Sequence, residues 1–144
     1  MRIPGRKLFR RLFTSTPSKS EKIARITPAI LYLILIFFVS AIPAGQLRPL
    51  TDDRIAHFVE YFILGVLLLI AAASFGPIER TKRWVFAAWL FGALFAVSDE
   101  VHQMYVPGRQ ASWNDVLFDV LGLTASMIGI VVMLKPNLKR RPVE

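Results

Sequence analysis

The chain has 144 residues, 54% of them hydrophobic, and a formal net charge of +8 at pH 7. Its length is that of a single domain, and its mean hydropathy of +0.48 is high for a soluble one. The absence of cysteine excludes disulfides, thiolate metal sites and cysteine nucleophiles. Fifteen of the eighteen Lys and Arg residues stand in three blocks, 1–25, 80–83 and 135–141, each beside a long apolar run. A nucleic-acid interface needs its cations on one solvated face, so we expect no nucleic-acid partner.

Four long apolar runs follow one another along the chain, at 27–44, 55–75, 84–101 and 115–134. Each has about 18–21 residues, close to the roughly 20 that a helix needs to cross a hydrocarbon core. None alternates as a spanning strand would, and a helix satisfies its own backbone hydrogen bonds in lipid. The first run is longer than the apolar part of a signal peptide, so we expect an uncleaved helix. The sequence therefore predicts an all-α fold, an integral membrane four-helix bundle.

The basic residues also predict the orientation of the bundle. Residues 1–25, 76–83 and 135–144 hold fifteen Lys and Arg, whereas 45–54 and 102–113 hold three. Connections on the cytoplasmic side of a membrane carry the excess of Lys and Arg. We therefore expect both termini and the middle connection to be cytoplasmic.

The same pattern divides the chain into three parts. We expect a basic, partly disordered cytoplasmic segment at 1–26, the four-helix membrane domain at 27–134 and a basic cytoplasmic tail at 135–144. In the first part, one helical face would carry Leu8, Phe9, Leu12 and Phe13. That face would lie on the inner leaflet, or the segment is only a topology signal in a disordered tail.

Most acidic residues gather at the outward ends of the second, third and fourth runs, and both histidines join them. The acids are Asp52, Asp53, Glu60, Asp99, Glu100, Asp115 and Asp119, and the histidines are His57 and His102. Helical spacing gives three polar faces: Asp53, His57 and Glu60; Asp99, His102 and Gln103, with Glu100 turned away; and Asp115, Asp119 and Gly122. A charge near the bilayer centre costs about 2.5–3.5 kcal/mol, so we expect these faces to pack together and to pair with Arg109.

Several of these residues also have a purely structural interpretation. Asp52, Asp53 and Glu100 fit interfacial or structural positions, and Asp115 suits the first turn of a helix. His57, Glu60, Asp99, His102, Arg109 and Asp119 are interpreted as functional, because ionisable groups inside a membrane are functional by default.

The polar residues leave three kinds of chemistry open. A divalent metal such as zinc would accept two histidines and a carboxylate, although the spacing of His57 and Glu60 is not that of the two-histidine zinc-protease motif. Arg109 would instead hold a phosphate or carboxylate of a lipid-linked substrate. The third option is proton or ion coupling in a transporter.

The same residues resemble the VanZ-like family of membrane proteins, over about residues 28–134. The resemblance rests on residues 53–65, 98–103, 106–109 and 112–115, followed by Asp119 and Gly122. Its most specific part is the order of three short groups: Asp99, Glu100, His102 and Gln103, then Pro107, Gly108 and Arg109, then Asp115. Asp119 stands where the family pattern often has Asn, and Glu60 lies outside the pattern.

The resemblance implies a four-helix membrane fold in a family named for resistance to the glycopeptide antibiotic teicoplanin. The leading hypothesis is a multi-pass protein of the bacterial cytoplasmic (inner) membrane, in contact with membrane lipids. It would bind or act on a cell-envelope component, a lipid-linked or glycan precursor, at the outer leaflet. Its catalytic residues would be His57, Asp99, His102 and Asp115, and its substrate-binding residues Arg109, Gln103, Asp119 and Glu60. The alternatives are a small proton- or ion-coupled transporter and a non-catalytic assembly factor.

Overall fold

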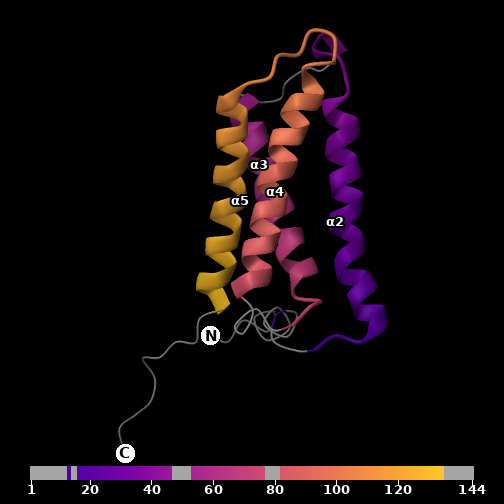
Figure 1. Cartoon of the computed structure of the whole chain (residues 1–144), viewed down its shortest axis with the longest axis vertical. Coiled ribbons are helices and arrows are strands. Elements are labelled where there is room, and N and C mark those ends of the chain that lie inside the picture. The colour runs from indigo at the N-terminus through magenta and orange to yellow at the C-terminus, as the bar shows by residue number, and fades with distance from the viewer. Residues whose placement is uncertain (1–12, 14–15, 47–52, 77–81, 135–144) are drawn as a thin grey trace, which may run out of the picture.

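A computed structural model of the chain describes Phe13 and residues 16–46, 53–76 and 82–134. These residues form four long helices and one short 3-10 helix, and no strand: α2 (Lys19–Ser40), η1 (Ala44–Gln46), α3 (Asp53–Ala72), α4 (Lys82–Gln103) and α5 (Trp113–Leu134). The four long helices stand side by side and alternate in direction (Figure 1). Each is long and apolar enough to cross a membrane. The predicted all-α membrane bundle is confirmed.

Helix α2 begins at Lys19, well before the apolar run that starts at residue 27. A capping box starts the helix, because the Ser18 hydroxyl accepts from the Glu21 N–H and the Glu21 carboxylate accepts from the Ser18 N–H. One turn later the buried Arg25 donates to the backbone oxygen of Ala73, which follows α3. Local capping thus extends the helix into the basic segment.

The predictions for the two ends of the chain fall mostly outside the described residues. Leu8, Phe9, Leu12 and the tail 135–144 are not described. Phe13 is described, and its side chain is fully buried in the apolar core. For Phe13 the structure therefore shows contact with the bundle.

Helices α3 and α5 make the closest contact in the bundle. At Gly122 of α5 a Cβ atom would collide with the backbone oxygen of Phe58, and at Gly65 of α3 one would collide with the Ser126 side chain. The two backbones approach this closely because glycine has no side chain. One turn before Gly122 lies Asp119, so the contact sets the height at which Asp119 faces α3.

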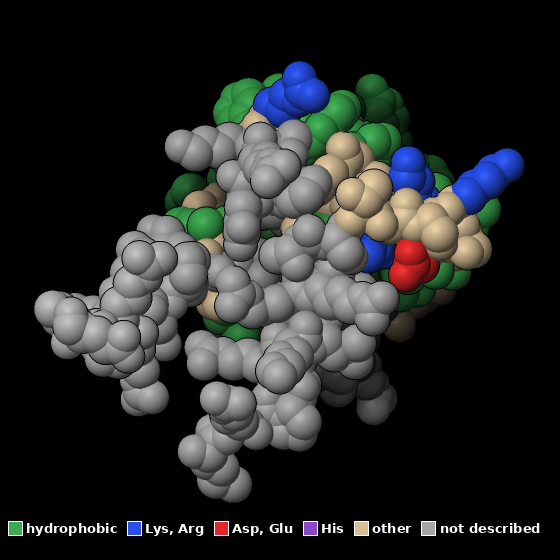
Figure 2. Space-filling view, turned by 90° about the horizontal axis from the view of Figure 1, so that it is seen from below, with side chains coloured by type: hydrophobic (Ala, Val, Ile, Leu, Met, Phe, Trp, Pro, Cys, Tyr) green, Lys and Arg blue, Asp and Glu red, His purple; other side chains and the backbone are tan. Residues whose placement is uncertain are grey.

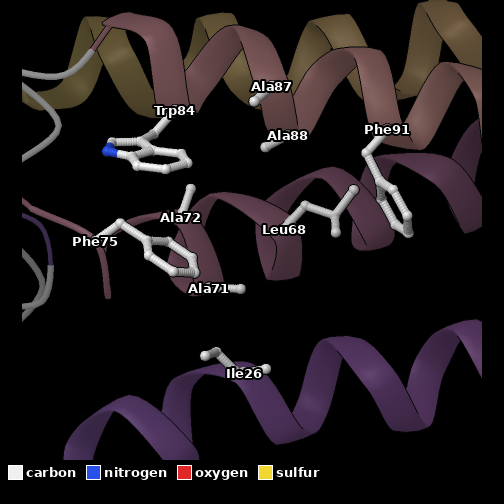
Figure 3. A pocket seen from close by; sticks show the side chains of 9 residues that line it. All are labelled: Ile26, Leu68, Ala71, Ala72, Phe75, Trp84, Ala87, Ala88 and Phe91. Carbon is white, nitrogen blue, oxygen red and sulfur yellow. The ribbon is translucent and has the colours of Figure 1, made fainter.

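The outward surface of the bundle is apolar, as expected of a protein in lipid. Large side chains such as Leu31, Phe38, Leu94 and Ile128 are between 58% and 64% exposed. A cavity of about 250 Å³ lies between α2, α3 and α4, and Figure 3 shows its apolar lining: Ile26, Leu68, Ala71, Ala72, Phe75, Trp84, Ala87, Ala88 and Phe91. This cavity offers no group for chemistry.

Most basic residues of the described chain lie at the lower end of the bundle, where α2 and α4 begin, whereas Arg54 and Arg109 lie at the upper end. Lys19, Lys22 and Arg83 are exposed there, and Figure 2 shows this end with its Lys and Arg side chains in blue. The placement agrees with the charge pattern behind the predicted orientation. The cytoplasmic location of the termini stays a prediction.

Candidate functional site: a buried ionisable cluster at the upper end

The upper end of the bundle, at the top of Figure 1, is where α2 and α4 end and where α3 and α5 begin. All eight predicted site residues lie at this end: His57 and Glu60 in α3, Asp99, His102 and Gln103 in α4, Arg109 in the following loop, and Asp115 and Asp119 in α5. The structure places five of them in two groups with different partners, and the other three lie beside these groups.

The first group, the His57 cluster, consists of His57, Glu100 and Asp119. The Nδ1 atom of His57 lies 3.0 Å from Oδ1 of Asp119, which joins α3 to α5. Glu100 of α4 completes the cluster, since one ligand atom from each residue lies within 4.8 Å of the others. The three residues are 6%, 4% and 0% exposed, respectively. Three helices therefore each place one ionisable side chain at one buried point.

The His57 cluster has more acceptors than donors. Oε2 of Glu100 accepts the Ser112 N–H at 2.8 Å. Oε1 of Glu100 and Oδ2 of Asp119 are buried and have no hydrogen-bond partner among the described residues, and the same is true of the Tyr61 hydroxyl. A buried carboxylate oxygen without a donor is costly. The cluster is therefore incomplete with the described protein groups alone.

The second group, the Asp99 network, consists of Ser40, Asp99, Gln103 and Arg109. The Ser40 hydroxyl donates to Oδ1 of Asp99 at 2.6 Å, and Nε2 of Gln103 donates to Oδ2 at 3.0 Å. Nη1 of Arg109 in turn donates to Oε1 of Gln103 at 3.3 Å. Both oxygens of Asp99 thus have donors, in contrast to Glu100 one residue later.

Arg109 connects the Asp99 network to the end of α2. Its Nε donates to the backbone oxygen of Ile42 at 3.2 Å and its Nη2 to that of Val39 at 3.4 Å. The last carbonyls of a helix lack intrahelical partners and attract a cation. Gly108 has a φ of +77°, and the turn that it forms brings the Arg109 N–H to the Val106 oxygen. This turn aims Arg109 at α2.

The remaining predicted site residues lie beside these two groups. The His102 ring stacks on Phe37 of α2, with centroids 4.5 Å apart, and its buried Nε2 has no partner among the described residues. Glu60 is half-buried and has no hydrogen bond to a described residue. Asp53 and Asp115 form a second set of close ligand atoms with His57, but Asp53 is exposed. His102 and Glu60 are therefore not part of the His57 cluster.

A pocket of about 360 Å³ opens between α4, the following loop and the start of α5. Its lining contains one charged residue, Glu100, among mostly apolar side chains: Val97, Val101, Met104, Ala111, Ser112, Trp113 and Val116. Trp113 is 82% exposed at the pocket and Met104 is 62% exposed. Glu100 is therefore shared between the buried cluster and a pocket that opens on the apolar surface.

The family model for VanZ/LLP1 matches residues 12–135, which include all four helices and both polar groups. The chain belongs to the VanZ/LLP1 family. The resemblance found in the sequence is thereby confirmed, and the chain is a multi-pass VanZ-like membrane protein. No solved structure matches the chain.

Sequence reasoning about this VanZ-like protein missed the placement of Glu100. Glu100 was interpreted as interfacial or structural because it points away from the face of Asp99. The structure buries Glu100 in the His57 cluster. Helix α4 packs against α2 on one side and against α3 and α5 on the other, so the faces that carry Asp99 and Glu100 both point into the bundle. The sequence did contain a signal for this placement. The small residues Gly92 and Ala96 suit a close helix contact, and Glu100 lies on the same helical face, at i, i+4 and i+8. Tyr61 was also missed, one turn after His57 and fully buried.

Proposed function

We propose that this VanZ-like protein binds, or acts on, a lipid-linked or glycan component of the bacterial cell envelope at the outer leaflet of the cytoplasmic membrane. One observation carries the proposal: Glu100 belongs both to the buried His57 cluster and to the wall of an apolar pocket. A ligand in that pocket would have a lipid chain against apolar walls and a polar group at the carboxylate. Such a pairing of apolar walls with a few fixed polar groups is typical of ligand sites.

The pocket suits an amphipathic ligand at a membrane surface. Val101 and Met104 are 49% and 62% exposed on the outside of α4, where they would face acyl chains. Trp113 stands at the start of α5, and tryptophan favours the membrane–water interface. The ligand would therefore enter sideways from the leaflet with its head at the level of Trp113.

The His57 cluster supplies the reactive groups in this proposal. His57 would present an imidazole and Asp119 a carboxylate beside the polar head of the ligand, and Glu100 would accept a hydrogen bond from a hydroxyl or amine of the ligand. Asp115 and Asp53 would extend the polar surface toward the aqueous side of His57. The Asp99 network, including Gln103 and Arg109, would position α4 so that Glu100 reaches the cluster.

The transporter alternative is disfavoured by the layer below the cluster. The buried side chains there are mostly apolar, namely Leu64, Leu68, Leu69, Leu123 and Met127. The hydroxyl of the buried Ser126 donates within its own helix, to the Leu123 oxygen. A proton or ion path to the lower end would have to cross this layer. The proposal therefore places the chemistry at the outer leaflet alone.

The fluorescence of Trp113 offers a direct test of binding. The purified protein in nanodiscs would be titrated with a polyprenyl-diphosphate-linked disaccharide, with the free disaccharide as a comparison. We expect a saturable change for the lipid-linked form that is absent in Trp113→Phe and strongly weakened in Glu100→Gln. Val101→Phe, which fills the pocket, should weaken binding, whereas Leu94→Phe, which adds the same ring outside the pocket, should not. A fluorescence change of wild-type size and affinity in both Glu100→Gln and Val101→Phe would contradict the proposed site.

The link to glycopeptide resistance has its own test in cells. Expression of the wild-type chain should raise the inhibitory concentration of teicoplanin, and His57→Ala should remove the effect at equal protein levels. An unchanged teicoplanin response with the wild-type chain would reject this part of the proposal.

A further inference from the structure

We propose that His57, Glu100 and Asp119 bind one divalent cation, Zn²⁺ or Mn²⁺, in the buried cluster. The inference names a cofactor for the site described above. The role of this cofactor in chemistry rests on the proposed function. Its support is independent of any envelope ligand, since it comes from the ligand types, their spacing and the unpartnered atoms.

The ligand set fits a divalent transition metal. It offers one imidazole nitrogen and carboxylate oxygens from two residues, and these atoms lie within 4.8 Å of one another. The contact of 3.0 Å between His57 Nδ1 and Asp119 Oδ1 is close to the roughly 3.3 Å that separates two ligands of a tetrahedral zinc ion. Imidazole suits zinc and carboxylates suit manganese, whereas magnesium prefers oxygen ligands and keeps several waters.

The unpartnered oxygens are a second and separate observation. Oε1 of Glu100 and Oδ2 of Asp119 are both buried without a donor among the described residues. Two ionised carboxylates and one histidine would also leave an uncompensated negative charge in the interior, even with the histidine protonated. A single dication would neutralise both carboxylates and provide the missing partner for their oxygens.

Three protein ligands leave a coordination position open. Glu100 lines the pocket between α4 and α5, so this position would face a ligand or a water there. A metal with an open position polarises a bound oxygen or activates a bound water, whereas a closed site is structural. The more exposed set of Asp53, His57 and Asp115 shares His57 and would compete for it. We assign the ion to the buried set because only that set has unpartnered buried oxygens.

Metal uptake by the full chain in nanodiscs tests the proposal without any envelope ligand. The protein would be stripped with a chelator, titrated with Zn²⁺ or Mn²⁺, and analysed for bound metal by mass spectrometry. We expect saturation at one ion per chain and an upward shift of the thermal midpoint. Glu100→Gln, Asp119→Asn and His57→Ala should each weaken binding by more than the roughly 10–100-fold that loss of an outer-shell partner costs.

Two matched variants separate a metal site from general damage. Glu60→Gln changes the half-buried acid of α3 that lies outside the cluster, and His102→Ala changes the other histidine of the chain. Both should keep the stoichiometry and affinity of the wild type. Absence of saturable uptake by the wild-type chain, or wild-type affinity in Glu100→Gln, would overturn the proposal. So would an equal loss of metal in the two control variants.

X-ray absorption of the metal-loaded wild-type protein covers the case of a variant that does not fold. The spectrum should show one imidazole and additional oxygen ligands, and a shell without imidazole would reject the site. The outcomes also distinguish the two proposals. Metal uptake without binding of the lipid-linked disaccharide would contradict the proposed function alone, and binding of the disaccharide without metal would contradict this inference alone.

Discussion

Asp99 and Glu100 are adjacent carboxylates in α4 with opposite surroundings. Asp99 receives hydrogen bonds on both oxygens, from Ser40 and Gln103, and so holds α2 against α4. Glu100 keeps one buried oxygen without a partner among the described residues and lies beside His57 and Asp119. Full hydrogen bonding indicates a structural role, whereas an unpartnered buried group indicates one that awaits a ligand. The two residues should therefore respond differently to the same change from acid to amide.

Arg109 illustrates how a cation predicted to hold a substrate is used within the protein. Three of its guanidinium N–H groups donate to the end of α2 and to Gln103. Lysine would lack the planar fork that reaches these separate acceptors. The predicted contact with an anionic headgroup stays a prediction, and the observed contacts assign Arg109 to positioning.

Replacement of Arg109 tests this positioning role. Arg109→Ala should lower the free energy of unfolding by about 1.5–3 kcal/mol, the range for hydrogen bonds that involve a charged group, and Arg109→Lys should recover little of it. Unfolding by denaturing detergent in mixed micelles measures the change. Gln110→Ala, at the exposed neighbouring position, is the matched control and should be neutral. Full stability in Arg109→Lys would show that charge alone suffices.

At the scale of elements, the α3–α5 contact aligns the His57 cluster. Gly122 lies against the backbone of Phe58, and Gly65 lies against Leu123 and Ser126. These contacts fix the rotation and height of α5 relative to α3, which places Asp119 opposite His57. The glycines are therefore part of the reason why His57 and Asp119 come into contact.

An added methyl group at Gly122 should separate the two helices. We expect Gly122→Ala to destabilise the protein by about 1–3 kcal/mol, as for overpacking in a tight interior, and to weaken the contact of His57 with Asp119. The matched control is Gly129→Ala in the same helix, where a Cβ atom would meet nothing within 4 Å. That change should be neutral or stabilise by up to about 1 kcal/mol through helix propensity. Thermal unfolding in detergent measures the stability of both variants. An equal change of stability in Gly122→Ala and Gly129→Ala would contradict the close contact at Gly122.

At the scale of the whole molecule, the orientation in the membrane decides which leaflet holds the His57 cluster. The chain has no cysteine, so single cysteines can be introduced as unique labels. Gln46→Cys at the upper end should react with a membrane-impermeant maleimide in intact cells, because the basic connections predict this end to be external. Lys22→Cys at the lower end should react only after permeabilisation. The reverse pattern would place the cluster at the inner leaflet and contradict the proposed function.

Much of the bundle could be predicted because each span is encoded locally. Apolar length gives the four helices, and the ends of the second, third and fourth runs carry the acids that meet at the upper end. The start of α2 was missed because the capping box of Ser18 and Glu21 is a polar signal outside the apolar run. The place of Glu100 in the His57 cluster was not predicted. Helix α4 has neighbours on two sides, so two of its faces are buried and periodicity alone does not show the second one.

The sequence by itself determined the number of spans, their apolar surfaces and the depth at which the ionisable groups stand. Helical periodicity also determined which residues share a face of one helix. Only the tertiary structure decided the partners: Asp119 with His57, Asp99 with Ser40 and Gln103, and Glu100 inside the cluster instead of at the interface. The physical reason is that periodicity fixes the direction of a side chain about its own helix axis, whereas the rotation of each helix toward its neighbours depends on close contacts such as Gly122 with Phe58.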